Sequence, residues 1–267
     1  MTMAFFLLGH TNQIDSATLS GGSWNSLYPL TNLQDTALAR VARSAGTTPA
    51  ASTVVIDCGA ARDIRTLGLV NHNLRPGAAT VRLEGSGSSG FSPPVADSGA
   101  VAVYPDNVSA FPTFTLDLGA VYTARYWRIT ISDSGNPDGH IRLGRVFLGD
   151  GWQPTETNFE WGRILGIKNP STVSVLPGGR RIVDARSPWR TVKYQFSDLS
   201  RTNALREIFQ IAWTHGLDRE VLVFEDPADT AYADVSNFLA TMRQLPSIEW
   251  PYLSGHSAAL EFSEIIA

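Results

Sequence analysis

Two segments that lie sixty residues apart in the chain repeat the same short pattern. Residues 55–60 read VIDCGA and residues 115–120 read TLDLGA, and a second apolar run follows each of them, at 67–70 and at 126–131. An apolar strand that ends in Asp-x-Gly, turns and returns as another strand is typical of β-sandwiches. Because this unit occurs twice, we predict that both copies belong to one antiparallel core.

The length and composition favour a mainly β protein with two domains. A chain of 267 residues exceeds the usual size of a single domain. Gly (23 residues) and Pro (15 residues) are frequent and only 17% of residues are charged, which is typical of turn-rich β structure rather than of a helical bundle. The formal net charge of −4 argues against nucleic-acid binding, which usually requires a basic excess.

The start of the chain carries no recognisable targeting or membrane-spanning signal. The apolar run at 4–8 has no basic residue before it, and it is too short for the apolar region of a signal peptide or for a membrane span. We therefore expect a protein that is made in the cytoplasm and does not insert into a membrane. Cys58 is the single cysteine, which excludes a disulfide within the chain.

A boundary is predicted near residue 150, where Gly149-Asp150-Gly151 is followed by Pro154. We predict a first β-sandwich domain at 1–150, with 1–10 as a segment that could pair elsewhere, and a second at 151–267. Strands are expected at 5–8, 53–58, 66–71, 79–84, 113–118, 125–132 and 141–148, and then at 172–176, 181–185, 191–196, 221–224, 237–242 and 259–265.

One helix is predicted at about 201–215 in the second domain. Ser200 is a suitable N-cap, and Gly216 suits the left-handed position after the last turn. The apolar residues of this segment have helical spacing, which predicts one face packed against the sheet. They are Leu205, Ile208, Phe209 and Ala212.

No motif in the sequence assigns a catalytic, metal-binding or cofactor-binding residue. The string Gly85-x-Gly87-x-x-Gly90 fits a dinucleotide fingerprint, but Pro93 and Pro94 exclude the helix that must follow it, so we interpret it as a loop. The oxygen-rich stretch 133–139 is interpreted as a turn, with a cation site as the alternative. The histidines form no ligand pair and no hydrolase motif occurs, so we predict that the protein is not an enzyme.

Two groups of residues are candidates for binding. Aromatic residues in loops of the first half could stack on a sugar, although packing beneath the loops explains them as well; His72 could line the same rim or cap a strand end. A basic cluster in the second half is either the solvated face of a hairpin or an inter-subunit contact made through arginine side chains. The candidate glycan rim is Trp24, Tyr28 and Tyr104, with Phe91 and Phe111 as further loop aromatics, and the basic cluster is Arg180, Arg181, Arg186, Arg190 and Lys193.

The first half resembles the galactose-binding-like jelly roll of discoidin and coagulation-factor C-type domains. The matching residues are IDCG at 56–59, LDLG at 116–119, YWRI at 126–129 and the closing GHIRLGRVFLG at 139–149. The closing segment is similar to that of discoidin-type modules in bacteriophage tail proteins. The resemblance covers about residues 25–150 and implies a jelly-roll sandwich.

The second half resembles the tail-tube-type domain of phage tail tubes, distal tail proteins and baseplate hubs. The features that match are a strand at 191–196, a helix at 202–215, a strand at 221–224 and a last strand that ends LEFSE at 260–264. The resemblance implies a β-sandwich with one flanking α-helix. The two domains stand in the reverse of the order that is common in distal tail proteins.

Together the resemblances imply a structural component of a siphophage tail tip or baseplate, without catalysis or a cofactor. Such a protein would form a homo-oligomeric ring, a hexamer or alternatively a trimer, and would contact tail tube, hub and fibre proteins. It would be located in the virion after synthesis in the host cytoplasm. The alternative is a lectin-like module that binds glycans of the host surface, and a third hypothesis is a glycan-acting enzyme.

Overall fold

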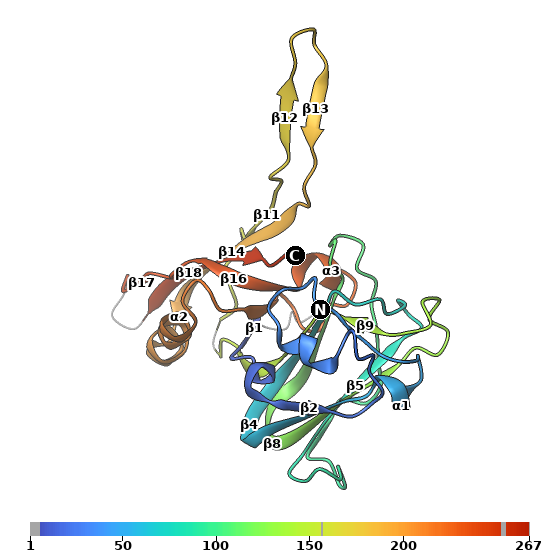
Figure 1. Ribbon diagram of the computed structural model, residues 1–267. Helices are drawn as coiled ribbons and strands as arrows, with labels where there is room; N and C mark the ends of the chain where they lie inside the picture. Colours follow the sequence, from blue (N-terminus) through green and yellow to red (C-terminus); the bar gives the residue numbers. More distant parts are fainter. Residues whose placement is uncertain (1–5, 156, 252–254, 267) are drawn as a thin grey trace. The chain divides into compact units, whose positions relative to one another are not determined.

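The computed structural model describes residues 6–155, 157–251 and 255–266 of the chain (Figure 1). The protein is mainly β, as predicted, and its strands pair antiparallel. The chain divides into two compact units. The first holds the residues up to Gln153 together with Glu220–Leu239, and the second holds Pro154–Arg219 and Ala240–Ile266. Within the described residues, no helix has the length and apolar character needed to cross a membrane.

This division differs from the predicted one at 150 because a segment from late in the chain returns to the first unit. Strand β1 (Leu7–His10) pairs on one side with β10 (Arg145–Trp152) and on the other with β15 (Val221–Phe224). The chain start therefore pairs with a strand more than two hundred residues away. No local pattern in the sequence encodes that pairing, so a boundary based on composition could not include it.

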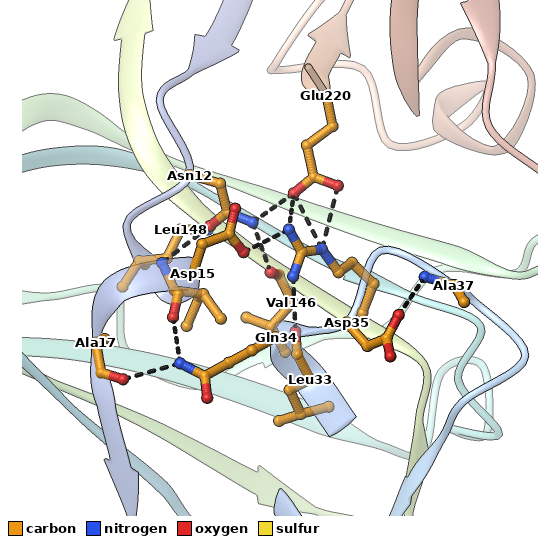
Figure 2. A network of polar contacts seen from close by, with 12 residues as sticks. Asn12, Asp15, Ala17, Leu33, Gln34, Asp35, Ala37, Val146, Leu148 and Glu220 are labelled. Carbon is orange, nitrogen blue, oxygen red and sulfur yellow. Dashed lines mark hydrogen bonds and ion pairs between the residues drawn. The ribbon is translucent and has the colours of Figure 1, made fainter. Parts of the chain in front are cut away.

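A buried ion pair holds the start of this returning segment in the first unit (Figure 2). Arg145 on β10 is fully buried, and its guanidinium donates to both carboxylate oxygens of Glu220, at 2.6 Å for the shortest contact. The same guanidinium pairs with Asp15 at 2.6 Å and donates to the carbonyl of Leu33 at 3.1 Å. The amide of Asn12 also donates to Glu220. Four separate segments of the chain thus meet at one arginine.

Two long strands replace the four short ones that were predicted around the repeated pattern. Strand β4 (Val54–Val70) and strand β8 (Thr113–Ser132) pair along most of their length, and the register shifts twice between them. One end of this ribbon also pairs with β2 (Thr18–Ser20) and β5 (Thr80–Ser86), and the other end with β10. Residues from both ends, such as Ile56 and Leu67, belong to one buried core, so the bent ribbon forms both layers of a sandwich.

Each register shift coincides with one copy of the Asp-x-Gly pattern. Gly59 and Gly119 have positive φ angles of 73° and 77°, a conformation that residues with a side chain adopt only with strain. The carboxylate of Asp57 accepts a hydrogen bond from the backbone N–H of Gly59 at 2.8 Å, and Asp117 does the same with Gly119 at 2.9 Å. The pattern therefore encodes a bulge, which bends each strand at the same relative place.

The two copies are also joined by reciprocal ion pairs. Asp57 of the first copy binds the guanidinium of Arg125 at 2.7 and 2.9 Å, and Asp117 of the second copy binds Arg65 at 2.8 and 3.0 Å. Both the two aspartates and the two arginines lie sixty positions apart. The arginine that follows each copy thus neutralises the aspartate of the other copy.

We expect the two equivalent aspartates to differ in their contribution to stability. The Arg65 and Asp117 side chains are each only 11% exposed, whereas those of Arg125 and Asp57 are 43% and 29% exposed. Charged hydrogen bonds that are shielded from water contribute about 1.5–3 kcal/mol, so Asp117→Ala should lower the free energy of unfolding by about that amount. Asp57→Ala should cost less, because water screens its pair. Urea unfolding of both variants measures the difference, and equal losses would contradict it.

The remaining elements of the first unit are short. They comprise the 3-10 helices η1 (Gln13–Ser16) and η2 (Leu30–Gln34), the strands β3 (Ala42–Arg43), β6 (Ala96–Asp97), β7 (Val101–Ala102) and β9 (Arg142–Leu143), and the helices α1 (Pro49–Ser52) and α3 (Ala233–Ser236).

The main sheet of the second unit is antiparallel. Its strands follow the order β11 (Ile164–Lys168), β14 (Trp189–Leu199), β18 (His256–Glu264) and β16 (Phe238–Gln244), and β17 (Ile248–Glu249) also pairs with β18. Strand β16 begins in the first unit and ends in the second. In the strand expected at 191–196, apolar residues alternate with polar ones, which predicts one buried face. Val192, Tyr194 and Phe196 are buried in β14, which confirms this prediction.

The predicted helix is present but does not bury the predicted face. Its first part, η3 (Asn203–Ile208), is a π-helix, and α2 (Phe209–His215) continues it. The wider π turn rotates the following residues relative to an ideal α-helix. As a result Ile208 and Ala212 are buried as predicted, but Phe209 is 51% exposed and Leu205 is only half-buried. The Ser200 hydroxyl accepts from the Asn203 N–H at 3.2 Å, as expected of an N-cap. Gly216 ends the helix with a positive φ of 60°, but its ψ of −144° lies outside the left-handed helical region that was predicted.

A two-stranded hairpin extends the strands β11 and β14 (Figure 1). It consists of β12 (Thr172–Val175) and β13 (Arg181–Asp184), and every residue of both strands is exposed. We refer to residues 169–188 as the hairpin arm.

Candidate functional site

The structure brings two of the three candidate rim residues together. Trp24 forms an isolated β-bridge with Ser44, and the carbonyl of Tyr28 accepts from the backbone N–H of Arg43 at 3.1 Å, so both flank β3. Trp24 is partly buried against the core. Tyr104 has a different role, because its hydroxyl bonds to the backbone N–H and the hydroxyl of Thr115 on β8, each at 2.8 Å. Tyr28 is therefore the rim residue that lies at a site with unused polar groups.

Two arginines lie side by side beside Tyr28. Strands β3 and β9 pair so that Arg43 is directly opposite Arg142, which places both side chains on the same face of the pair. The guanidinium of Arg43 stacks on the ring of Tyr28, 4.0 Å from its centroid. Among the ion pairs of the described residues, none involves Arg43 or Arg142. Like charges opposite each other are unfavourable, and no ion pair of the described residues offsets this cost.

A buried histidine lies next to the arginine pair. His72 is 4% exposed, and its Nδ1 accepts from the backbone N–H of Leu74 at 3.2 Å, which places the proton of the neutral ring on Nε2. That Nε2 and the Nε atoms of Arg43 and Arg142 are buried without a hydrogen-bond partner. Burial and the charge of Arg142 lower the pKa of His72 to about 4. We call His72, Arg43, Arg142 and Tyr28 the arginine cluster.

The side chain of Asn73 fixes the position of β9 beside this cluster. Its Oδ1 accepts from the backbone N–H of Arg142 at 2.7 Å, and its Nδ2 donates to Asp138 at 2.8 Å and to the carbonyl of His140 at 3.0 Å. Asp138 belongs to the oxygen-rich stretch 133–139 for which a cation site was the alternative, and His140 follows it. Within the described residues, no group of three acidic, histidine or cysteine side chains could hold a metal ion.

The arginine cluster offers hydrogen-bond donors and an aromatic ring. Both arginine side chains are partly exposed, so their outer N–H groups are accessible to a ligand. A guanidinium has only hydrogen-bond donors and no acceptor. A suitable ligand therefore supplies oxygen acceptors and an apolar face for the ring. The sequence did not reveal Arg43 and Arg142 as a pair, because they are 99 positions apart and only β3–β9 pairing joins them.

The lowered pKa of His72 predicts that the stability of the fold depends on pH. An unfolded histidine binds a proton near pH 6.5, whereas His72 in the fold does so only near pH 4. Between these values the unfolded state binds more protons, so stability falls as the pH is lowered, by about 3 kcal/mol in total. His72→Asn should remove this component, and His140→Asn, in the neighbouring loop, serves as the control. Urea unfolding at pH 7 and at pH 4.5 measures it; an unchanged pH slope in His72→Asn would contradict the assignment.

The five residues of the predicted basic cluster do not form one exposed group, because two of them are held in ion pairs within the sheet. Arg190 is 3% exposed and pairs with Glu264 at 2.6 Å, and Lys193 pairs with Glu261 at 3.0 Å. Both side chains therefore hold β14 to β18, and they do not belong to an exposed basic cluster as was predicted. The reason is that cross-strand acids on β18, seventy residues later in the chain, neutralise them. Arg180, Arg181 and Arg186 lie on the hairpin arm and are exposed, with Arg186 paired to Asp184 at 3.0 Å.

Cys58 has the properties of a core residue. Burial raises the pKa of its thiol to about 11, so the reactive thiolate is scarce at neutral pH. In the other predicted loop, at 85–90, Gly85 and Ser86 end strand β5, and the residues at 87–90 form bends and turns.

The comparisons with known proteins show distant likeness in fold only. No protein-family model matches the chain, and no curated protein matches it significantly. Several solved structures match about half of it. They include a mutant lectin binding domain of lectinolysin complexed with Lewis b (13% identity, 54% of this chain, 98% of that chain, TM-score 0.41), chitosan-binding module 1 of a chitosanase/glucanase from Paenibacillus sp. IK-5 (17%, 52%, 98%, 0.37) and a Streptococcus pneumoniae fucose binding module (12%, 52%, 94%, 0.39).

A further match is to SpGH29, at 15% identity and a TM-score of 0.37, and it covers 54% of this chain but only 28% of that one. By their names, three of the four structures are carbohydrate-binding modules, and none of the four is a phage tail protein. At this identity and TM-score the likeness assigns neither a ligand nor an activity to the chain.

Proposed function

We propose that this protein binds carbohydrate at the arginine cluster and catalyses no reaction. The observation that carries the proposal is the pair Arg43 and Arg142, side by side and without a carboxylate partner among the described ion pairs, next to an aromatic ring. No cofactor is required for such binding.

Sugars match what this cluster offers. Their hydroxyl, ring and carboxylate oxygens accept hydrogen bonds, and the planar guanidinium groups donate in a fixed geometry. The C–H face of a pyranose packs on aromatic rings, and Tyr28 provides such a ring in the cluster. Lewis b, chitosan and fucose, the ligands named for the structures above, belong to the same chemical class. The proposal rests on the cluster and not on that likeness.

A glycan array with the full chain tests the proposal. We expect binding to a restricted set of glycans, and a loss of at least tenfold in affinity for Arg142→Ala and for Arg43→Ala. Tyr28→Ala should weaken binding less, because the ring contributes mainly stacking. Arg62→Ala is the matched control, since Arg62 is an exposed arginine on β4 outside the cluster. An array without any bound glycan, or equal losses in Arg142→Ala and Arg62→Ala, would refute the proposal.

A second candidate function is structural, and the hairpin arm favours it. An isolated two-stranded hairpin is marginally stable in water. The arm nevertheless exposes apolar side chains, with Val175 65% exposed and Val183 54% exposed, beside exposed arginines. A neighbouring subunit that covers the arm would stabilise it, as the predicted role in a phage tail tip requires.

The structural candidate predicts where the protein is found. Antibodies against this chain should label the tail tip of the virion, and replacement of residues 172–184 by a short Gly-Ser turn should prevent incorporation while β11 and β14 still pair. Labelling elsewhere, or normal incorporation without the arm, would reject this candidate and leave the glycan proposal unaffected.

A further inference from the structure

The exposed face of the helix in the second unit has the character of a docking surface. Phe209 and Trp213 lie one turn apart, with ring centroids 6.1 Å apart and nearly parallel planes, and they are 51% and 81% exposed. The π turn of η3 is the cause, because it rotates Phe209 away from the buried side. Two aromatic side chains that remain in water forgo favourable burial of apolar surface, which a partner could recover.

Phe209 also lines a pocket that is positively charged. The pocket has a volume of about 520 Å³ and is lined by Arg201, Thr202, Leu205, Arg206 and Phe209. Arg201 and Arg206 are exposed, and neither takes part in an ion pair of the described residues. Arg201 also lies in the first turn of the helix, at its positive end, where a cation is unfavourable unless an anion approaches it. We call the pocket residues and Trp213 the helix patch.

The first unit carries a segment of complementary chemistry. Residues 225–236 contain four acidic residues and no basic one. Within them, Tyr232 is 69% exposed, and Asp226 and Asp229 form no ion pair among the described residues. Each of these two carboxylates accepts backbone N–H groups of the following residues through Oδ1 only, at 2.9 Å for the closest. The second oxygen, Oδ2, makes none of these bonds. We call residues 226–232 the acidic loop.

We propose that the helix patch of one copy binds the acidic loop of a second copy. The two guanidinium groups pair with Asp226 and Asp229, and Tyr232 packs against Phe209 and Trp213. Backbone bonds hold the acidic loop in turns before contact, so little conformational entropy is lost on binding. This inference goes beyond glycan binding and does not depend on it.

The geometry of such a contact determines the assembly. The helix patch and the acidic loop are different surfaces, so each copy offers one donor and one acceptor surface and the contact is head-to-tail. Head-to-tail contacts generate closed rings or open filaments rather than only dimers. Because its charged part is exposed, the contact should weaken as salt screens the charges.

Sedimentation velocity of the full chain with exchanged charges tests the proposal. Wild type should associate as its concentration rises in 50 mM salt, and several-fold more weakly in 500 mM salt. Arg201→Asp/Arg206→Asp and Asp226→Arg/Asp229→Arg should each associate at least tenfold more weakly. An equimolar mixture of the two variants should regain association, because each then meets a surface of opposite charge. Arg40→Asp/Arg62→Asp, which changes the same charge at exposed arginines of the first unit, is the matched control and should behave as wild type.

Each contrary result has a defined meaning. A wild type that stays monomeric overturns the proposal, and so does association that the Arg201/Arg206 exchange leaves unchanged. Weaker association in that variant but not in Asp226→Arg/Asp229→Arg would show that another segment occupies the helix patch, which also overturns it. Trp213→Ala adds an uncharged test: its side chain is exposed, so it should fold normally and still associate at least tenfold more weakly.

Discussion

Replacement of Arg145 by Met should lower the free energy of unfolding of the first unit by about 3–5 kcal/mol. Arg145 is fully buried, and Glu220, its main partner, is only 9% exposed. Without the guanidinium, the Glu220 carboxylate stays buried without compensation, and the carbonyl of Leu33 loses its donor. Removal of one member of a buried pair costs more than the pair itself contributes, because the remaining charge cannot regain its water.

A double variant tests whether the uncompensated charge of Glu220 causes the loss of stability. Glu220→Leu in the Arg145→Met background should restore part of the loss, because an apolar pair of similar volume avoids the buried charge. Arg40→Met is the control; its ion pair with Asp35 is exposed, with the Arg40 side chain 71% exposed, so little change is expected. Urea unfolding gives the three values. A double variant that is less stable than Arg145→Met would show that the network stabilises by packing and not by charge compensation.

Trp127→Ala should be about as destabilising, at about 3–5 kcal/mol. Trp127 on β8 is fully buried, and its indole N–H donates to the carbonyl of Ala124 at 3.2 Å. The ring lies over Gly85 of β5, where an added Cβ would come within 2.7 Å of it. Its removal leaves a large cavity that the paired strands β4, β5 and β8 cannot close, and cavity size sets the cost.

The same substitution at another tryptophan is the control for this prediction. Trp161 in the second unit is 96% exposed, so Trp161→Ala should change stability by no more than about 0.5 kcal/mol. Unfolding followed by circular dichroism compares the two variants without relying on tryptophan fluorescence. Equal stabilities of Trp127→Ala and wild type would show that the core of the first unit collapses around the missing ring.

Most strands of this protein follow from local sequence patterns. The expected runs at 79–84, 191–196 and 221–224 correspond to β5, β14 and β15 within a few residues. Alternation along β14 also predicted correctly which side chains are buried. These predictions succeed because a strand with one buried face must place apolar residues at every second position.

Predictions that depend on which distant segment packs against a helix or strand were less accurate. Phe209 was expected on the buried face of the helix, but the π turn of η3 rotates it toward the exposed side. Arg190 and Lys193 were grouped with the hairpin arginines because the acids that neutralise them, Glu264 and Glu261, lie far along the chain. The spacing of apolar residues indicates the local conformation of a segment, but it does not reveal which distant segment packs against it.

The sequence by itself determined the mainly β character, the repeated Asp-x-Gly bulges and the N-cap of the helix. These features depend on residues within a few positions of one another. The tertiary structure alone decided that Asp57 pairs with Arg125, that Glu220 returns to Arg145 and that Arg43 meets Arg142. Each of these contacts joins residues separated by at least 68 positions, and only strand pairing and core packing bring them into the range at which charges and hydrogen bonds act.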